Sequence, residues 1–283
     1  MTFSELREYI HHKLEILYPK SEINAFYFIL LKHYGKYSKA TILANSDTLL
    51  TEDIAQPILQ AIRELQTAKP IQYILGETEF FSNRFFVNEN VLIPRPETEE
   101  LVDWVLQEYP DKSKKIKILD VGTGSGCIAI SLAKALPNAV VTAIDVSEGA
   151  LKVAKRNAEL NSVVTYFLQQ DILQIETLPD KYDIIISNPP YVRELEKKEI
   201  HHNVLEYEPY LALFVPDNNP LLFYNKIATL AQQSLNPNGS LFFEINQYLG
   251  QEMQTLLEQK YFTEITLRQD LFGKDRMIKA KQL

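Results

Sequence analysis

The stretch that decides the fold of this chain is Ile118-Leu119-Asp120-Val121-Gly122-Thr123-Gly124-Ser125-Gly126-Cys127. Its first residues are apolar enough to form a buried strand, and the apolar residues that follow Cys127 have helical spacing. The three alternating glycines therefore lie in a turn between a strand and a helix. In such a turn a ligand can approach bare backbone, and the amides at the helix start are free to donate hydrogen bonds.

The spacing of these glycines separates one class of ligand from another. A dinucleotide fingerprint has the form Gly-x-Gly-x-x-Gly, whereas this chain has Gly-x-Gly-x-Gly with Asp120 just ahead of it. About 20 residues after the turn, Asp145 ends a second predicted strand, where a carboxylate can accept hydrogen bonds from both hydroxyls of a ribose. Asp171 ends a third and is placed to approach an adenine edge, with Ile172 offering an apolar face. A nucleoside without phosphates therefore fits this pattern better than a dinucleotide. The alternative interpretation, that the glycines form only a tight turn between strand and helix, is weaker because Asp145 stands where a ligand-binding site would need it.

Strands and helices alternate along the rest of this region, which predicts a mostly parallel sheet covered on both faces. We expect strands at 116–121, 139–145, 163–168, 182–187 and 240–245, helices at 127–136, 151–160, 220–235 and 251–258, and a turn at 236–239. The chain should close with an antiparallel hairpin of strands 262–268 and 277–280 at the edge of the sheet.

The N-terminal part has a different pattern. Apolar residues recur every three or four positions between 2 and 70, which predicts a small bundle of four or five helices. Thr2 with Glu5 three residues later marks one helix start, and Pro57 marks another as a first-turn proline. We therefore divide the chain into a helical domain at 1–75 that recognises the substrate, a β-hairpin linker at 76–91 and an α/β domain at 92–283.

Two proline-containing stretches stand at predicted strand and helix ends. Ser187-Asn188-Pro189-Pro190-Tyr191 follows an apolar strand, and its prolines hold the chain stiff, so Asn188 and Tyr191 can be presented at fixed positions. The alternative is an ordinary rigid turn. Ile93-Pro94-Arg95-Pro96-Glu97 can open a helix with acidic residues at its favourable end.

Composition narrows the class of protein. Apolar residues make up 46% and charged residues 23%, and no apolar run is long enough to cross a bilayer, so we expect a soluble protein without a membrane partner. Cys127 is the only cysteine, which excludes an intramolecular disulfide and a cysteine metal cluster and favours the cytoplasm. The histidine pairs are adjacent rather than four apart, so no metal site is predicted. A net charge of −8 disfavours nucleic acid as partner.

The order and spacing of Asp120–Gly126, Asp145 and Asn188–Tyr191 resemble the Rossmann-like S-adenosylmethionine-dependent methyltransferases that act on planar nitrogen. Ile74–Glu77, Ile93–Glu99 and Gly273–Arg276 narrow the resemblance, over essentially the whole chain, to the PrmC/HemK family of peptide chain release factor glutamine methyltransferases. The glycine-rich loop of many family members is replaced here by Val215–Pro220. The resemblance implies S-adenosylmethionine as cofactor, S-adenosylhomocysteine as product and a release factor as partner. It also implies that Ile93–Glu97 closes over the cofactor.

The positions above and the resemblance together assign roles to single residues. Cofactor contacts are expected from Gly122, Thr123, Gly124, Ser125, Gly126, Asp145, Asp171, Ile172 and Asn188, and substrate contacts from Asn188, Pro189, Pro190 and Tyr191. Asn188, Pro189 and Tyr191 are the predicted catalytic residues: the Asn188 side-chain oxygen and the Pro189 carbonyl accept the two amide hydrogens of a glutamine, and Tyr191 stacks on the flat amide.

Two other function classes are considered. Nucleic-acid amino-methyltransferases hold an exocyclic base nitrogen with a similar short motif, often after base flipping, but residues 1–75 have only scattered basic positions such as Lys32, Lys36 and Lys39. A binding scaffold without chemistry should have lost Asp145 or Asn188–Tyr191, and both are intact.

Overall fold

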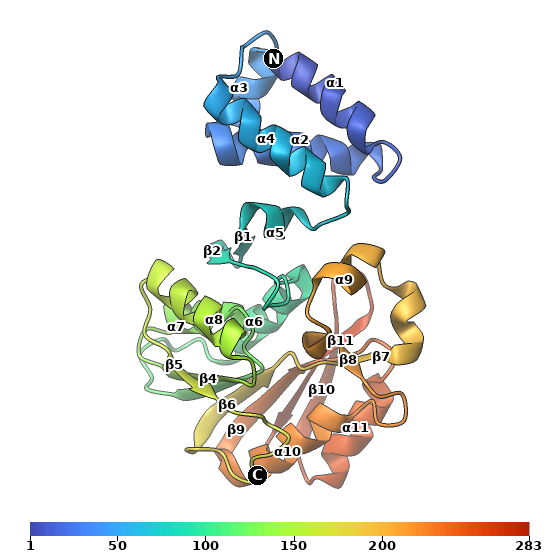
Figure 1. Cartoon of the computed structure of the whole chain (residues 1–283). Coiled ribbons are helices and arrows are strands. Elements are labelled where there is room, and N and C mark those ends of the chain that lie inside the picture. Colours follow the sequence, from blue (N-terminus) through green and yellow to red (C-terminus); the bar gives the residue numbers. More distant parts are fainter. Residues whose placement is uncertain (283) are drawn as a thin grey trace. The chain divides into compact units, whose positions relative to one another are not determined.

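A computed structural model of the chain describes residues 1–282 and places them in two compact units (Figure 1). The first unit contains Met1–Gly76 and His201–Tyr207, and the second contains Glu77–Ile200 and the chain from Glu208 onward. The β-hairpin therefore belongs to the second unit, and a short segment far along the chain belongs to the first.

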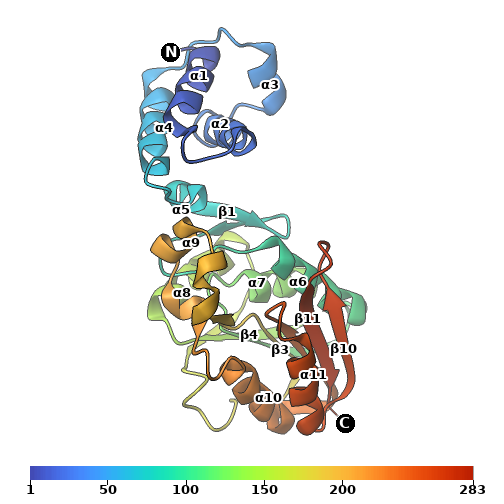
Figure 2. The same cartoon turned by 90° about the vertical axis from the view of Figure 1, so that its right-hand side faces the viewer.

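The first unit is a bundle of helices around its own apolar core (Figure 2). Its helices are α1 (Phe3–Leu14), α2 (Lys20–Gly35), α3 (Lys39–Ala44), α4 (Glu52–Leu65) and α5 (Ile71–Leu75). The predicted start of α1 is confirmed, since the Thr2 hydroxyl accepts from the Glu5 amide and the Glu5 carboxylate accepts from the Thr2 amide.

The prediction that Pro57 opens a helix is wrong. Helix α4 starts five residues earlier, after Thr51, with Glu52 and Asp53 in its first turn, and Pro57 lies inside it. The acidic first turn is favourable at a helix start. The proline removes only the hydrogen bond to the carbonyl of Asp53, an exposed residue in the first turn of the helix, and the helix continues past it.

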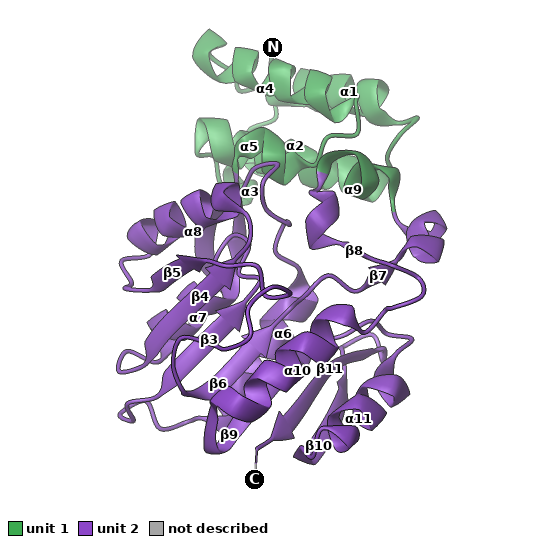
Figure 3. Ribbon diagram, turned by 60° about the horizontal axis from the view of Figure 1, so that its bottom comes forward, with its two compact units in different colours: residues 1–76, 201–207 green, residues 77–200, 208–283 purple. Residues whose placement is uncertain are grey.

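Helix α9 (His202–Tyr207) completes the first unit, although its neighbours in sequence belong to the second (Figure 3). The Tyr207 hydroxyl donates to the carbonyl of Thr67 over 2.8 Å and lies 3.0 Å from the hydroxyl of Thr67. This pair joins positions 140 residues apart. No local sequence pattern could have predicted it.

The second unit begins with the antiparallel hairpin of β1 (Glu77–Phe80) and β2 (Asn83–Phe86). Its two turn residues, Phe81 and Ser82, both have positive φ angles, as a two-residue type I′ turn requires. Phe80 and Phe85 are buried in the core of the second unit, so the hairpin is anchored there.

A seven-stranded sheet forms the centre of the second unit within residues 1–282 (Figure 1). Its strands are β3 (Lys117–Val121), β4 (Val140–Asp145), β5 (Tyr166–Gln169), β6 (Tyr182–Ser187), β9 (Leu235–Glu244), β10 (Thr263–Gln269) and β11 (Asp275–Lys281). The order is β10-β11-β9-β6-β3-β4-β5, with β5, β4, β3, β6 and β9 parallel and β11 and β10 antiparallel. The predicted fold class, including the C-terminal hairpin, is confirmed.

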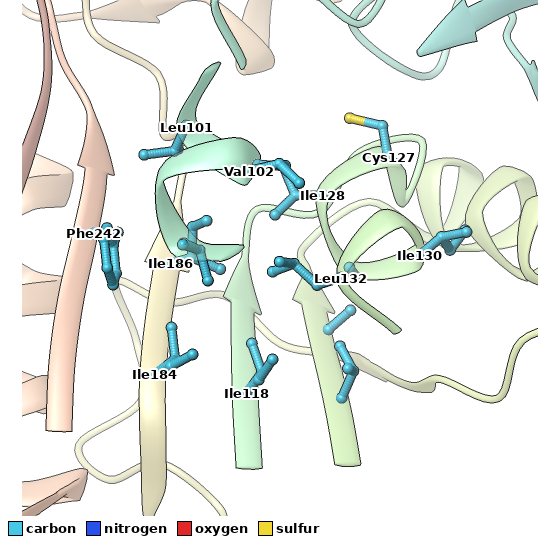
Figure 4. Close-up of a cluster of buried hydrophobic side chains, with 14 of the residues drawn as sticks. Leu101, Val102, Ile118, Cys127, Ile128, Ile130, Leu132, Ile184, Ile186 and Phe242 are labelled. Atoms are coloured by element: carbon cyan, nitrogen blue, oxygen red, sulfur yellow. The ribbon is translucent and has the colours of Figure 1, made fainter. Parts of the chain in front are cut away.

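Helices cover both faces of this sheet. On one face lie α6 (Pro96–Glu108), α7 (Cys127–Ala135) and α8 (Glu148–Leu160), and on the other α10 (Leu222–Ser234) and α11 (Gly250–Gln259). Figure 4 shows Leu101 of α6 and Ile128 of α7 on the side of the sheet where Ile118 and Ile186 point. All four side chains are buried and belong to the apolar core on that face. A second apolar core lies on the other face, and the two together stabilise the sheet.

The connection from β6 to α10 is made of short elements. They are β7 (Val192–Arg193), a 3₁₀ helix at Glu194–Glu199, α9, a second 3₁₀ helix at Tyr210–Ala212 and β8 (Phe214–Val215). Strands β7 and β8 pair in parallel, so Val215, where the predicted loop 215–220 begins, is strand.

Several predicted boundaries differ from the structure. Helix α8 begins three residues earlier than expected, because the Ser147 hydroxyl caps it by accepting from the Ala150 amide. Strand β5 begins three residues later than expected because Ser162, at φ 56°, ends α8 in a Schellman motif in which the Val163 amide donates to the Ala158 carbonyl. The turn expected at 236–239 lies within β9, where the pairing register with β6 shifts and Asn238 has φ 63°. In the described part of the chain, no helix combines the length and apolar character that a bilayer crossing needs.

Asn157 offers a test of how the second unit is held together. It is fully buried, its Oδ1 accepts from the Phe86 amide, and its Nδ2 donates to the carbonyls of Phe86 and Ser125. Asn157→Ala leaves these three backbone groups without partners, so we expect the free energy of unfolding to fall by about 2–4 kcal/mol in a denaturant titration.

Asn161→Ala, one helical turn later, is the matched control. Asn161 donates only to the carbonyls of Arg84 and Asn157 and is partly exposed, so water can replace it and the loss should stay within about 1 kcal/mol. Equal losses in the two variants would contradict the role given to Asn157.

Candidate functional site

Three sequence motifs meet at one edge of the sheet. Strand β3 lies between β4 and β6 and is parallel to both, and Val121 is in register with Ile144 on one side and Ser187 on the other. The carboxyl ends of adjacent parallel strands share an edge, which is where ligands bind in open α/β sheets. The glycine turn after β3, Asp145 at the end of β4 and Asn188 after β6 are thereby brought together.

The glycine turn has an open part and a packed part. Gly122 and Gly124 have φ angles of +74° and +54°, and a Cβ added at either would meet no atom within 4 Å. Gly126, at +83°, precedes α7, and a Cβ there would come within 2.8 Å of Ile130. The first two glycines keep backbone open to a ligand, whereas the third lets the helix start pack closely.

A cavity of about 330 Å³ lies at this edge. Its lining includes Gly122, Thr123, Gly124, Ser125, Asp145, Asp171, Ile172, Asn188, Pro189 and Pro190. Gly126 and Tyr191 were also predicted to contact ligands but do not border this cavity. Its volume is in the range of small-molecule sites.

Two acidic residues of the cavity wall have defined partners. The two carboxylate oxygens of Asp145 accept from the amides of Gly124, over 2.8 Å, and Ser147, over 2.9 Å, and burial raises the pKa of this carboxyl. Asp171 lies two residues after the end of β5, not at its end, and accepts from the Leu173 amide over 2.9 Å. Each oxygen still has a free lone pair that a ligand can use.

Two further polar groups lie beside the turn. Asp120 is fully buried beneath it, accepts from the Thr123 hydroxyl over 2.6 Å, and has a pKa raised to about 7 by burial. Gln170 borders the cavity, and its Oε1 is buried with no hydrogen-bond partner among the described residues. A buried acceptor in this state costs free energy.

Asn188 and Tyr191 join a buried polar cluster on the side of the site nearer β9. The Asn188 amide nitrogen donates to the Thr98 hydroxyl over 3.2 Å, and that hydroxyl donates to Oε2 of Glu244 over 2.6 Å. The Tyr191 hydroxyl donates to Oε1 of Glu244 over 2.9 Å. Both oxygens of this carboxylate, which is 1% exposed, therefore have partners.

Charge in this cluster is balanced by Arg276. Burial raises the pKa of Glu244, and the Thr98 and Tyr191 hydroxyls and Arg276 oppose that rise. Burial, then the charge of Glu244, raises the pKa of Tyr191 well above its ordinary value, so its hydroxyl keeps its proton. Arg276 is held by an ion pair of 3.0 Å with Asp270, which closes the turn between β10 and β11.

A second, smaller cavity of about 60 Å³ lies next to this cluster. It is lined by Leu92, Arg95, Asn188, Pro189, Tyr191, Val192, Ala212, Leu213 and Glu244. Asn188 and Pro189 line both cavities, so this dipeptide forms part of the wall between a large and a small binding space.

The proline-rich stretch before α6 serves two purposes. Arg95 is the N-cap of α6 and Pro96 its first residue, so the interpretation as a helix entry is confirmed. Pro94 and Arg95 also line the large cavity. The stretch is fixed by Glu208, whose carboxylate accepts from the Ile93 amide over 3.1 Å and pairs with Arg95 over 2.5 Å.

Sequence reasoning missed Thr98, Glu208 and Glu244. Glu244 ends the apolar strand Leu241-Phe242-Phe243, so its place at the carboxyl end of a parallel strand was the signal that could have identified it. Glu208 has no comparable signal, since its partners are more than a hundred residues away in the chain.

Two family models match this chain. Residues 101–209 match the methyltransferase small domain family and residues 5–76 match the PrmC N-terminal domain family. The chain is 53% identical over 282 residues to the release factor glutamine methyltransferase of Flavobacterium psychrophilum, covering 99% of both proteins. It is 44% identical to that of Bacteroides thetaiotaomicron, covering 99% of this chain and 100% of the relative.

Solved structures of other methyltransferases are similar to this chain in fold only. The Thermus thermophilus 16S rRNA N2 G1207 methyltransferase, in complex with AdoMet and guanosine, is 17% identical with a TM-score of 0.53, over 73% of this chain and 50% of that one. A Pyrococcus furiosus methyltransferase is 16% identical with a TM-score of 0.52, over 82% and 99%. On the strength of its full-length relatives, the chain belongs to the release factor glutamine methyltransferase family.

Proposed function

We propose that this protein transfers a methyl group from S-adenosylmethionine to the side-chain amide nitrogen of a glutamine in a peptide chain release factor. The observation that carries the proposal is that Asn188 and Pro189 line both cavities, one large enough for a nucleoside and one for a small planar group. The relatives named as release factor glutamine methyltransferases support the choice of substrate.

The large cavity fits S-adenosylmethionine, with S-adenosylhomocysteine as the product. Open backbone at Gly122 and Gly124 leaves room against the turn, while Asp145 can accept from ribose hydroxyls. Asp171 offers an acceptor, and Ile172 offers an apolar wall. When bound, the cofactor supplies an electrophilic methyl group on a positively charged sulfur.

Thr123, Ser125, Gly126 and Asn188 complete the proposed cofactor residues. Thr123, Ser125 and Asn188 border the cavity, whereas Gly126 contributes by letting α7 start close to the turn.

The small cavity holds the methyl acceptor. A carboxamide nitrogen is a poor nucleophile because its lone pair is delocalised into the carbonyl, so the protein must orient it. We assign the Asn188 side-chain oxygen and the Pro189 carbonyl as acceptors for its two hydrogens, with Pro190 keeping the backbone stiff. After methyl transfer the nitrogen is cationic, and it loses one of these two hydrogens as a proton. Tyr191, whose hydroxyl is fixed by Glu244, lies along the same cavity and packs on the amide plane.

Positioning and exclusion of water account for the rate in this scheme. Well-oriented reacting groups can gain roughly 7–11 kcal/mol of barrier reduction in favourable models. The residues of the small cavity contribute by replacing water around the acceptor with fixed hydrogen bonds, and the apolar neighbours Leu213 and Val192 keep the site dry.

The other parts of the proposal concern the partner. We assign recognition of the release factor to the helical domain at 1–75, with the hairpin at 76–91 as the linker and 92–283 as the catalytic domain. The acidic charge of −8 supports a protein substrate without a direct nucleic-acid or membrane partner. Because release factors work on ribosomes, we place the enzyme in the cytoplasm.

A label-transfer experiment tests the function. The purified protein is incubated with methyl-labelled S-adenosylmethionine and one of three acceptors: a release factor, the same factor with its target glutamine replaced, and duplex DNA. We expect label in the first alone. Label in DNA and none in the intact factor would reverse the choice of substrate.

Asn188→Ala tests the acceptor site. Removing the amide should lower the methylation rate by about 100-fold or more, since a transition-state hydrogen bond and the alignment it gives are both lost. Binding of the cofactor, followed by calorimetry, should change much less. The control is Asn225→Ala on the exposed side of α10, which should keep full activity. Near-normal turnover by Asn188→Ala with intact cofactor binding would refute the assignment.

Glu208→Ala tests the stretch that lines the large cavity. Without this carboxylate the Ile93 amide and Arg95 lose their partner, so we expect the dissociation constant of the cofactor to rise about tenfold. Glu206→Ala, two residues earlier and paired only with His202, is the control and should bind normally. Equal affinities in the two variants would show that Glu208 does not shape the cavity.

A further inference from the structure

The hydrogen bonds around Thr98 have a fixed direction. A threonine hydroxyl has one proton to donate and lone pairs to accept. Thr98 donates that proton to Oε2 of Glu244 over 2.6 Å, so toward Asn188, 3.2 Å away, it can only accept. An asparagine side chain has its donors at one end and its acceptor at the other. The end of Asn188 that faces Thr98 must therefore be the NH₂ group.

Glu244 determines which group donates and which accepts in these hydrogen bonds. One oxygen of its carboxyl group accepts from the Thr98 hydroxyl and the other accepts from the Tyr191 hydroxyl, so neither hydroxyl has a second proton to donate elsewhere. It is buried at the end of β9, and the nearby guanidinium of Arg276, itself paired with Asp270, compensates its charge. One carboxylate thus orients both side chains proposed to hold the methyl acceptor.

We propose that Thr98 and Glu244 are positioning residues that fix which end of the Asn188 amide faces the small cavity. With its NH₂ bound to Thr98, Asn188 presents its oxygen to the ligand. An oxygen at this place accepts from the NH₂ of a glutamine and repels the carboxylate of a glutamate. Thr98 and Glu244 therefore favour a nitrogen as the methyl acceptor, although neither residue contacts that nitrogen. This inference rests on the proposed glutamine methylation.

Thr98→Val tests the inference, because valine keeps the shape of threonine and removes the hydroxyl. The Asn188 amide can then turn, so we expect the single-turnover methylation rate of the release factor to fall about 10- to 100-fold. Thr98 borders the large cavity, but valine keeps its shape there and no hydrogen bond of Thr98 is assigned to the cofactor, so the cofactor dissociation constant should stay within about twofold. Thr98→Ser, which restores the hydroxyl, should recover activity to within about threefold of the wild type.

Thr165→Val is the matched control. The Thr165 hydroxyl is buried without a hydrogen-bond partner among the described residues, next to β5 and outside the proposed catalytic residues. The same chemical change there should leave the methylation rate unaltered. A fall equal to that of Thr98→Val would mean that loss of a buried hydroxyl slows the enzyme regardless of its position, and would overturn the inference.

A double-mutant cycle separates positioning from general damage. If Thr98 acts through Asn188, then Thr98→Val should cost nothing further in the Asn188→Ala background. The same fold-loss in both backgrounds, or a Thr98→Val variant as fast as the wild type, would overturn the inference. Failure of the wild type to methylate the release factor would instead refute the proposed function, so the two failures are distinguishable.

Glu244→Met carries the same test if Thr98→Val does not fold, as judged by thermal unfolding. Methionine has nearly the shape of glutamate but no oxygen that can accept from the Thr98 or Tyr191 hydroxyl, so Thr98 is free to donate toward Asn188 and the fixed direction is lost. We expect a loss of turnover without a comparable loss of cofactor affinity. Unchanged turnover in Glu244→Met would overturn the inference.

Discussion

The parallel pairing of β3 with β4 on one side and β6 on the other is the constraint on which the rest of the site depends. Parallel neighbours must end at the same edge, so residues that are separated by a helix and a strand in sequence arrive within one ligand's width. Most side chains of these strands are apolar and are buried between two layers of helices, and the Ser187 hydroxyl of β6 adds a hydrogen bond to the Val121 carbonyl of β3. The chemistry is thus carried by loops whose positions are fixed by an apolar core.

Burying a carboxylate such as that of Glu244 lowers the stability of the fold unless other interactions compensate, so its presence at this edge needs an explanation. Removing a carboxylate from water costs several kcal/mol even after relaxation, and hydrogen bonds to a charged group return about 1.5–3 kcal/mol each. Glu244 accepts two of them and lies near Arg276. The balance is near neutral for stability, so Glu244 is explained by the order it imposes on Asn188 and Tyr191 and not by the free energy of folding.

The sequence was informative wherever a pattern is local. Apolar runs with polar ends located β3, β4 and β6, and the glycines and Asp145 located the turn, because strand burial and backbone access leave a signature within a few residues. The start of β5 was missed because the helix cap at Ser162 uses residues whose composition suits a strand. Glu208 was missed because its partner Ile93 lies 115 residues away, and such a pair follows from topology alone. Glu244 did have a local signal, its place at the end of an apolar strand, but its partner Thr98 lies 146 residues away.

The segment that forms α9 has a consequence for how the chain can be divided. Because His201–Tyr207 belongs to the first unit while the residues on both sides belong to the second, the backbone passes between the units at three points, after Gly76, Ile200 and Tyr207. A single cut cannot separate two intact pieces. Deleting residues 1–76 would leave α9 without Thr67, and the very next residue after α9 is Glu208, the anchor of Ile93 and Arg95. Each unit is therefore incomplete as a genetic fragment, although each has its own core.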